Sequence, residues 1–162
     1  MKKLFLVLVA LLFTFGLTSC DLFGNEPLEF SGSGITITLD DSFQETDTMY
    51  VSFYLESFDY IFTGEREDKT LFSNTGIDNL EDYINAVLEY ADNEDEEVIL
   101  SEDETFYYAY YTASVDEDEF GYMLICMESD DYYYVMNFGC YENKLDDSKE
   151  QFFEWVDTIV IE

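Results

Sequence analysis

The first part of the chain alternates apolar and polar side chains. Residues 35–39 (ITITL) follow the two-residue period of a half-buried strand, and Asp40-Asp41-Ser42 ends the alternation. Apolar and aromatic residues predict two further strands at 49–56 and 60–63. We therefore expect three strands in succession before the first helix.

A helical period follows. Asp78 and, three residues later, Glu81 have the pattern of a capping box. Beyond them, apolar side chains recur at the spacing of one helical face, which predicts an amphipathic helix of about three turns. The residues on this face are Leu80, Tyr83, Ile84, Val87, Leu88 and Ala91.

A second helix is expected near the end of the chain. Asp147 and Glu150 repeat the capping-box pattern. The apolar face of this helix would carry Phe152, Phe153, Val156 and Val160, with Trp155 beside it. The last apolar residues, 159–161, either complete the helix or form a short strand.

Between the helices lie a short apolar segment, 98–100, and three aromatic-rich segments, 105–114, 120–128 and 132–141, which predict an antiparallel meander. Large apolar residues occupy both faces of these strands, so both faces must be covered. Phe106, Tyr108 and Tyr110 share one face, and Tyr107, Ala109 and Tyr111 share the other. The predicted fold is α+β, a three-layer α/β/α sandwich with a mainly antiparallel sheet of about six or seven strands and two main helices.

The N-terminus has the pattern of a signal peptide. Lys2 and Lys3 precede an apolar stretch, 4–15, which at twelve residues is shorter than the ~20 needed to span a bilayer. The segment 17–20 (LTSC) resembles the lipobox of bacterial lipoproteins. The resemblance implies cleavage before Cys20, lipidation of Cys20, and a location on the outer side of the cell membrane. A secreted protein with a coincidental Cys, or a buried apolar helix, are the alternatives.

Three segments follow from this interpretation. Residues 1–19 form the signal peptide, and residues 20–34, which contain the single proline and several glycines, form a flexible tether. Residues 35–162 form one domain of ordinary size.

The net charge of the chain limits the classes of partner that it can bind. The chain has 6 Lys and Arg against 38 Asp and Glu, a net charge of −32, and removal of the signal peptide with its two lysines brings the charge to −34. Such a surface excludes nucleic acid and repels anionic lipid, so membrane attachment must come from the lipid on Cys20. The absence of His removes the usual zinc sites and His-based catalytic sets.

Carboxylate clusters are the remaining candidate chemistry. The weak candidates for cation ligands are Asp92, Glu94, Asp95, Glu96, Asp116 and Asp118. The run from Asp92 has Glu97 where an EF-hand loop has glycine, so we expect weak collective binding of divalent cations rather than a specific metal or cofactor. No phosphate loop or nucleophile elbow occurs, and with so many acids a pair at the spacing of a glycosidase is uninformative. An enzyme is not expected, and a hydrolase is the weakest of the interpretations.

Two cysteines follow Cys20, and export favours a disulfide between them. The expected hairpin places Cys126 opposite residues 133–135, which leaves Cys140 about 16–23 Å further along the strand. A disulfide needs Cα atoms within about 7 Å. We therefore expect free, mostly buried thiols.

The chain opens with a strand and turn (GITITLDDSF), continues with the middle helix and the aromatic meander, and closes with the segment FFEWVDTIVIE. This order of elements resembles the PsbP-like and Mog-like superfamily, which includes lipoproteins of the DcrB type. Members bind other proteins, such as a small GTPase or a photosystem, and share no active site. The resemblance implies a non-catalytic binding or accessory module for a protein partner. The alternative is a solute- or glycan-binding lipoprotein that uses exposed tyrosines and acids. Tyrosines 107, 108, 110, 111 and 132–134 would serve core packing, an interface, or both.

Overall fold

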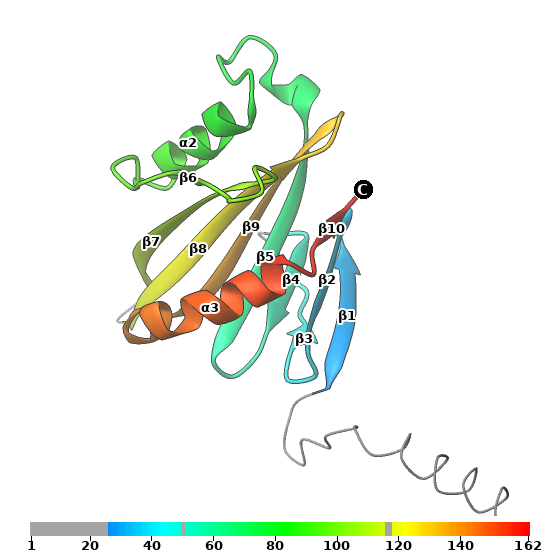
Figure 1. The fold of residues 1–162 in the computed structure, drawn as a ribbon, viewed down its shortest axis with the longest axis vertical. Coiled ribbons are helices and arrows are strands. Elements are labelled where there is room, and N and C mark those ends of the chain that lie inside the picture. The colour runs from blue at the N-terminus through cyan, green and yellow to red at the C-terminus, as the bar shows by residue number, and fades with distance from the viewer. Residues whose placement is uncertain (1–25, 50, 116–117) are drawn as a thin grey trace, which may run out of the picture.

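The computed structural model describes residues 26–49, 51–115 and 118–162 (Figure 1). The predicted signal peptide, Cys20 and Asp116 lie outside the described residues. Within these ranges, no helix is both long enough and apolar enough to cross a membrane.

The main sheet has seven strands: β3 (Gln44–Glu45), β4 (Phe53–Glu56), β5 (Tyr60–Asp68), β6 (Ile99–Leu100), β7 (Tyr107–Val115), β8 (Asp118–Glu128) and β9 (Tyr132–Tyr141). Their order is β3-β4-β5-β9-β8-β7-β6, and every neighbouring pair is antiparallel. The aromatic meander is thus confirmed. The strand predicted at 60–63 continues to Asp68 because its charged second half pairs with β9 along the whole length.

The predicted strand at 35–39 is correct, but it belongs to a separate sheet. β2 (Ile35–Asp40) lies between β1 (Pro27–Gly32) and β10 (Val160–Ile161), antiparallel to both. The flexible tether predicted at 20–34 is wrong from Pro27 onward, because residues 27–32 form the strand β1. Ser33 and Gly34 have positive φ angles of 51° and 71°, which close a two-residue hairpin between β1 and β2.

The middle helix, α2 (Leu80–Tyr90), is confirmed, but its cap lies one residue later than predicted. The Asn79 side chain accepts a hydrogen bond from the Asp82 N–H at 2.9 Å, and the Asp82 carboxylate accepts one from the Asp78 N–H at 3.2 Å. Asp82, rather than Glu81, therefore completes the capping box, because it is the third residue after the Asn79 cap.

The closing helix, α3 (Leu145–Val156), begins earlier than its predicted capping box. A 3-10 turn, η2 (Glu142–Lys144), leads directly into it. Ser148, expected near the start, is instead buried inside the helix, where its hydroxyl donates to the Lys144 carbonyl at 2.8 Å. The helix ends before Val160, which lies on β10 and is exposed, so the predicted helical face is wrong at that position.

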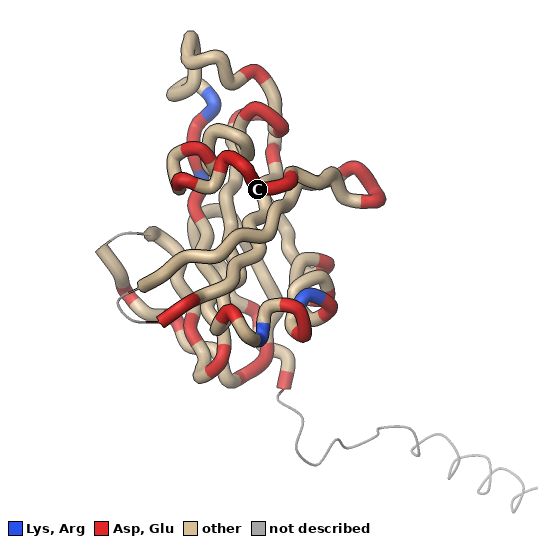
Figure 2. Tube along the Cα trace, turned by 90° about the vertical axis from the view of Figure 1, so that its left-hand side faces the viewer, with Lys and Arg blue, Asp and Glu red and all other residues tan. Residues whose placement is uncertain are grey.

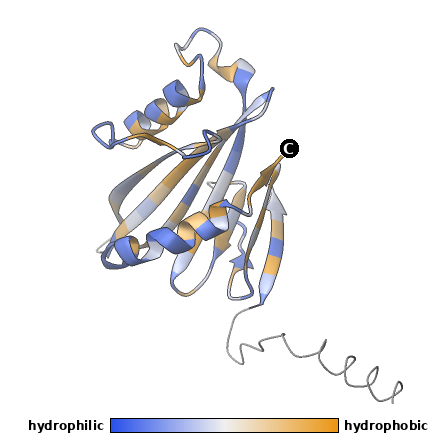
Figure 3. Ribbon diagram, viewed as in Figure 1, coloured by the Kyte–Doolittle hydropathy of each residue, from blue (hydrophilic) through white to orange (hydrophobic). Residues whose placement is uncertain are grey.

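The three-layer α/β/α arrangement is confirmed, and one outer layer is mixed (Figures 1 and 3). α2 covers one face of the main sheet through Leu80, Tyr83, Ile84 and Leu88. α3 and the three-stranded sheet together cover the other face. Their buried contributions are Phe152, Trp155 and Val156 from α3 and Ile35, Ile37 and Leu39 from β2.

The two cysteines lie on opposite faces of the main sheet. Cys126 pairs with Val135 and belongs to the core beneath α2, whereas Cys140 pairs with Gly121 and belongs to the core beneath α3. Both are free and buried, as predicted. Burial raises the pKa of each thiol, which keeps both protonated and unreactive near neutral pH.

Candidate functional site

α2 covers only one end of its face of the main sheet. The sheet register aligns side chains in rows across the strands, and α2 packs over three of these rows. The covered rows are Glu128–Tyr133–Glu67, Tyr107–Cys126–Val135–Glu65 and Ala109–Leu124–Asn137–Thr63.

Two further rows on the same face extend beyond α2. They are Tyr111–Tyr122–Gly139–Ile61–Glu56 and Ala113–Phe120–Tyr141. In these rows only Gly139 is buried, and Tyr141 is 44% exposed. We call the apolar part of this surface, with Tyr54 from the adjoining row, the open face. It comprises Tyr54, Ile61, Tyr111, Phe120, Tyr122 and Tyr141.

The rings of the open face are ordered by contact with one another. Tyr111 and Tyr122 stack with ring centroids 4.9 Å apart, and Phe120 stacks on Tyr141 at 5.2 Å. A Cβ at Gly139 would lie 2.7 Å from the Tyr122 ring and 2.8 Å from Ile61, so glycine is what allows that ring to lie flat on the sheet. These residues form a preordered aromatic platform, which would lose little side-chain entropy on binding.

The hydroxyl groups of Tyr54, Tyr111 and Tyr122 on the open face remain protonated at physiological pH. Tyr111 donates to the Asn137 side chain at 3.0 Å. Desolvation raises the pKa of Tyr111, Tyr122 and Tyr54, and the Glu56 carboxylate adds to the increase at Tyr54. The platform therefore offers neutral donors and apolar rings rather than an ionised nucleophile.

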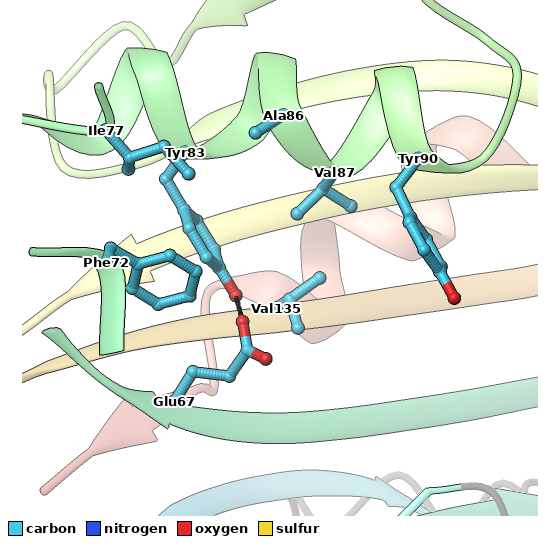
Figure 4. A pocket seen from close by; sticks show the side chains of 8 residues that line it. All are labelled: Glu67, Phe72, Ile77, Tyr83, Ala86, Val87, Tyr90 and Val135. Carbon is cyan, nitrogen blue, oxygen red and sulfur yellow. Dashed lines mark hydrogen bonds between the residues drawn. The ribbon is translucent and has the colours of Figure 1, made fainter. Parts of the chain in front are cut away.

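A groove lies between α2 and the strands β5 and β9 (Figure 4). It has a volume of about 380 Å³. α2 supplies one wall with Ala86, Val87 and Tyr90, and Tyr90 is 94% exposed. The remaining lining residues are Glu67, Phe72, Ile77, Tyr83 and Val135.

Glu67 is the charged group of the groove. Its carboxylate accepts a hydrogen bond from the Tyr83 hydroxyl at 2.5 Å, and the Tyr83 ring stacks on Tyr133 at 4.4 Å. Burial, followed by this hydrogen bond, raises the pKa of Tyr83. The hydroxyl therefore serves to hold α2 to β5, and the groove presents an apolar wall with one carboxylate.

An acidic recess of about 620 Å³ lies on the other face of the sheet, next to β6. Phe106, Tyr108 and Phe153 supply its aromatic lining, and Glu102, Asp103 and Asp157 supply its carboxylates. Hydrogen bonds from Ser101 and Thr105 lower the pKa of Asp103, which keeps that carboxylate ionised.

The carboxylates proposed as cation ligands are distributed over separate loops (Figure 2). Asp92, Glu94, Asp95 and Glu96 follow α2, and Asp118 begins β8. In the described part of the chain, no three carboxylate or thiol side chains come together as a possible metal site. The weak collective binding of divalent cations stays a prediction.

The sequence pattern indicated part of this site. It placed Tyr107 and Tyr111 on one face, as observed, but Tyr133 and Tyr134 proved to be core residues. It did not single out Ile61, Phe120, Tyr122, Tyr141 or Glu67. The alternation of β8 would have placed Phe120 and Tyr122 on one face, but only the register shows that this face meets Tyr111 and lies beyond α2.

Comparison with known proteins identifies the class of fold. No known family model matches the sequence, and no curated protein matches it. Solved structures with the PsbP-like fold do match, which confirms the predicted fold.

Three similar structures are informative. The solution structure of cyanobacterial PsbP (CyanoP) from Synechocystis sp. PCC 6803 has a TM-score of 0.61 and 13% identity, covering 90% of this chain and 99% of that chain. A mutant of the protein Mog1 has a TM-score of 0.54 and 9% identity over 86% and 96% of the two chains. A protein from Bacteroides thetaiotaomicron VPI-5482 has a TM-score of 0.51 and 10% identity over 83% of this chain and 48% of that one. At these identities the similarity defines the fold alone.

Proposed function

We propose that this protein is an outward-facing bacterial lipoprotein, anchored through lipid on Cys20, whose folded body is a non-catalytic accessory module that binds a protein partner. The open face is the observation that carries this proposal. Ordered aromatic rings and Ile61 remain partly exposed on this face of the sheet, and Tyr141 is 44% exposed. Exposed aromatic surface of this kind is typical of protein interaction sites.

The shape of the surface favours a protein over a small solute. The open face spans five neighbouring strands, β4, β5, β9, β8 and β7, with Ile61 on β5 and the rings on the other four. The groove beside α2 holds one carboxylate, that of Glu67, which already accepts a hydrogen bond from the Tyr83 hydroxyl. A broad platform fits a macromolecular surface better than a pocket-bound ligand. The net charge restricts that partner to a neutral or basic surface.

Photo-crosslinking in intact cells tests the proposed interface. A photoreactive phenylalanine replaces Tyr141 on the open face, and the matched control replaces Phe58, which is 96% exposed in the β4–β5 turn. We expect one specific protein adduct from the Tyr141 position and none from the Phe58 position. Adducts of equal yield from both positions, or from neither, would contradict the proposal. Loss of the adduct on addition of soluble glycans would support the glycan-binding alternative instead.

The anchor is tested separately. Cells fed labelled palmitate should incorporate the label into the wild-type protein and not into Cys20→Ser, and the wild-type protein should fractionate with membranes. Cys126→Ser is the control, because this buried thiol has no role in the proposed anchor. Equal labelling of wild type and Cys20→Ser would refute lipidation at Cys20.

A further inference from the structure

Among the described residues, none pairs with the outer edge of β7 beyond its first two positions. β6 pairs only with Tyr107 and Tyr108, and the Phe106 carbonyl accepts from the Ser101 N–H at 2.9 Å. Backbone groups of an antiparallel strand point alternately to its two neighbours. The N–H and C=O groups of Tyr110, Thr112 and Ser114 therefore point away from β8, and no other described strand lies beside them. We call residues 109–115 the free edge.

The free edge lacks the protection that edge strands usually carry. Its sequence, AYYTASV, contains no charge and no proline, although charged residues make up 27% of the chain. By contrast, the edge strand β1 carries Pro27 and Glu29. At the opposite edge of the main sheet β3 is short, and the residue after it, Thr46, donates its N–H to the Tyr54 carbonyl of β4. Charges and prolines normally prevent edge-to-edge association. A long uncharged edge without them is a template for an added strand.

Carboxylates bracket the free edge at both ends. The acidic loop ending at Glu96 and Glu97 enters β6 next to Ala109, and the recess with Glu102 and Asp157 borders β6. At the far end, Asp118 and Glu119 lie on β8 opposite Val115 and Ser114, and the Glu119 carboxylate accepts a hydrogen bond from the Ser114 hydroxyl of β7 at 2.6 Å. Between them the edge extends about 20 Å, from six steps of ~3.3 Å.

We propose that the free edge receives an extended segment of a partner protein, in which uncharged residues of high strand propensity lie between basic residues. The segment adds a strand beside β7, and its Lys or Arg side chains meet the carboxylates at each end. This inference rests on the proposed function and specifies how the partner is recognised.

Charge selects this occupant over a second copy of the chain. Antiparallel pairing of two β7 strands would place Asp118 and Glu119 of one copy against the acidic loop of the other. Lys149, whose ammonium lies 4.5 Å from the Tyr110 ring centre, is already paired with Asp146 at 2.7 Å and does not relieve this repulsion. A basic segment removes the repulsion at both ends.

Amide hydrogen exchange, followed by NMR on the full-length protein in detergent, tests the inference. The probe is a capped peptide of alternating Thr and Val flanked at each end by two Lys, and its control carries Glu in place of Lys. In the free protein, the amides of Tyr110, Thr112 and Ser114 should exchange rapidly, whereas those of Ala109, Tyr111 and Ala113 should be protected by β8. The basic peptide should slow exchange of the three outward amides by about tenfold or more. The acidic peptide should have no effect.

A pair of variants at one position separates edge pairing from general binding. Thr112→Pro removes one outward N–H while leaving the ladder to β8, and it should abolish protection by the basic peptide. Thr112→Val keeps that N–H and should bind as the wild type does. Protection of Ala109, Tyr111 and Ala113 in both variants verifies that the sheet is intact.

Three results would overturn the inference. The first is the absence of protection by the basic peptide, and the second is equal protection by both peptides. The third is protection in the free protein that increases with protein concentration, which would identify a second copy as the occupant. If the Tyr141 adduct of the cross-linking experiment persists while the edge amides remain unprotected, the edge inference fails and the proposed interface stands.

Discussion

Replacing Tyr83 by Phe removes the hydrogen bond that joins α2 to β5 and keeps the packing of the ring. The ring is 1% exposed, stacks on Tyr133 at 4.4 Å, and meets Phe72 edge-on at 5.4 Å. Phe preserves these contacts, so the change isolates the hydroxyl and its 2.5 Å bond to Glu67.

The expected cost follows from the burial of the two partners. A hydrogen bond to a charged group contributes about 1.5–3 kcal/mol to stability. Glu67 is only half-buried, so water reaches its carboxylate once the hydroxyl is gone, and the cost should fall near the lower limit. We expect a loss of about 1.5 kcal/mol in the free energy of unfolding, which corresponds to a decrease in Tm of about 6 °C for a domain of this size.

Urea unfolding and calorimetry measure the change, with Tyr107→Phe as the matched control. The Tyr107 hydroxyl lies 3.5 Å from the Glu81 carboxylate in an exposed position, so its loss should change stability by less than about 0.5 kcal/mol. Equal effects of the two substitutions, or no effect of Tyr83→Phe, would refute the role assigned to the Tyr83–Glu67 bond.

The same variant has a pH signature. Burial and the Glu67 bond raise the pKa of Tyr83 above its ordinary value of 10.0, so the folded state holds this proton more tightly than the unfolded chain does. The stabilisation is complete below pH 10.0 and is lost as the pH rises through the folded pKa. The wild type should therefore lose stability more steeply than Tyr83→Phe in the alkaline range. Parallel curves would contradict this assignment.

Three other predictions test the fold and its charge. Gly32→Ala should destabilise the protein by about 1–3 kcal/mol, because the new Cβ would lie 2.5 Å from the buried Phe53 ring. The control Ser31→Ala, on the same strand, should be nearly neutral. Equal melting temperatures of the two variants would favour a flexible tether in this segment. Cys126 and Cys140 should resist alkylation in the native state and both react in denaturant without reductant, and a failure to react would indicate a disulfide. Millimolar calcium or magnesium should raise Tm, because divalent ions reduce the repulsion among 38 carboxylates; a Tm independent of salt would contradict this.

Local pattern was sufficient for the elements whose side chains face a core. The period of Leu80, Tyr83 and Leu88 identified α2, and the composition of the meander strands identified β7, β8 and β9. The register of the β8–β9 hairpin could then be predicted closely enough to show that Cys126 and Cys140 are too far apart for a disulfide. These outcomes depend on short-range geometry, which a sequence encodes directly.

Elements that form because a neighbouring strand pairs with them were not accessible from local pattern. Pro27 and the nearby glycines suggested a tether, yet β1 forms because β2 offers six paired positions. Residues 65–68 are all charged, yet they extend β5 because β9 lies beside them. In both places pairing across the sheet outweighed local propensity.

The sequence by itself determined a signal-peptide pattern, a strongly acidic surface and a sheet that is apolar on both faces. Only the tertiary structure decided which part of that sheet stays uncovered. α2, with 11 residues, is about 16 Å long, whereas β8, also with 11 residues, extends about 36 Å, because a helix rises 1.5 Å per residue and a strand about 3.3 Å. A single helix of that length leaves Tyr141 exposed beyond its end and Phe120 and Tyr122 partly exposed. The open face and the free edge of β7 follow from this difference in length and from the position of β6, neither of which a local pattern contains.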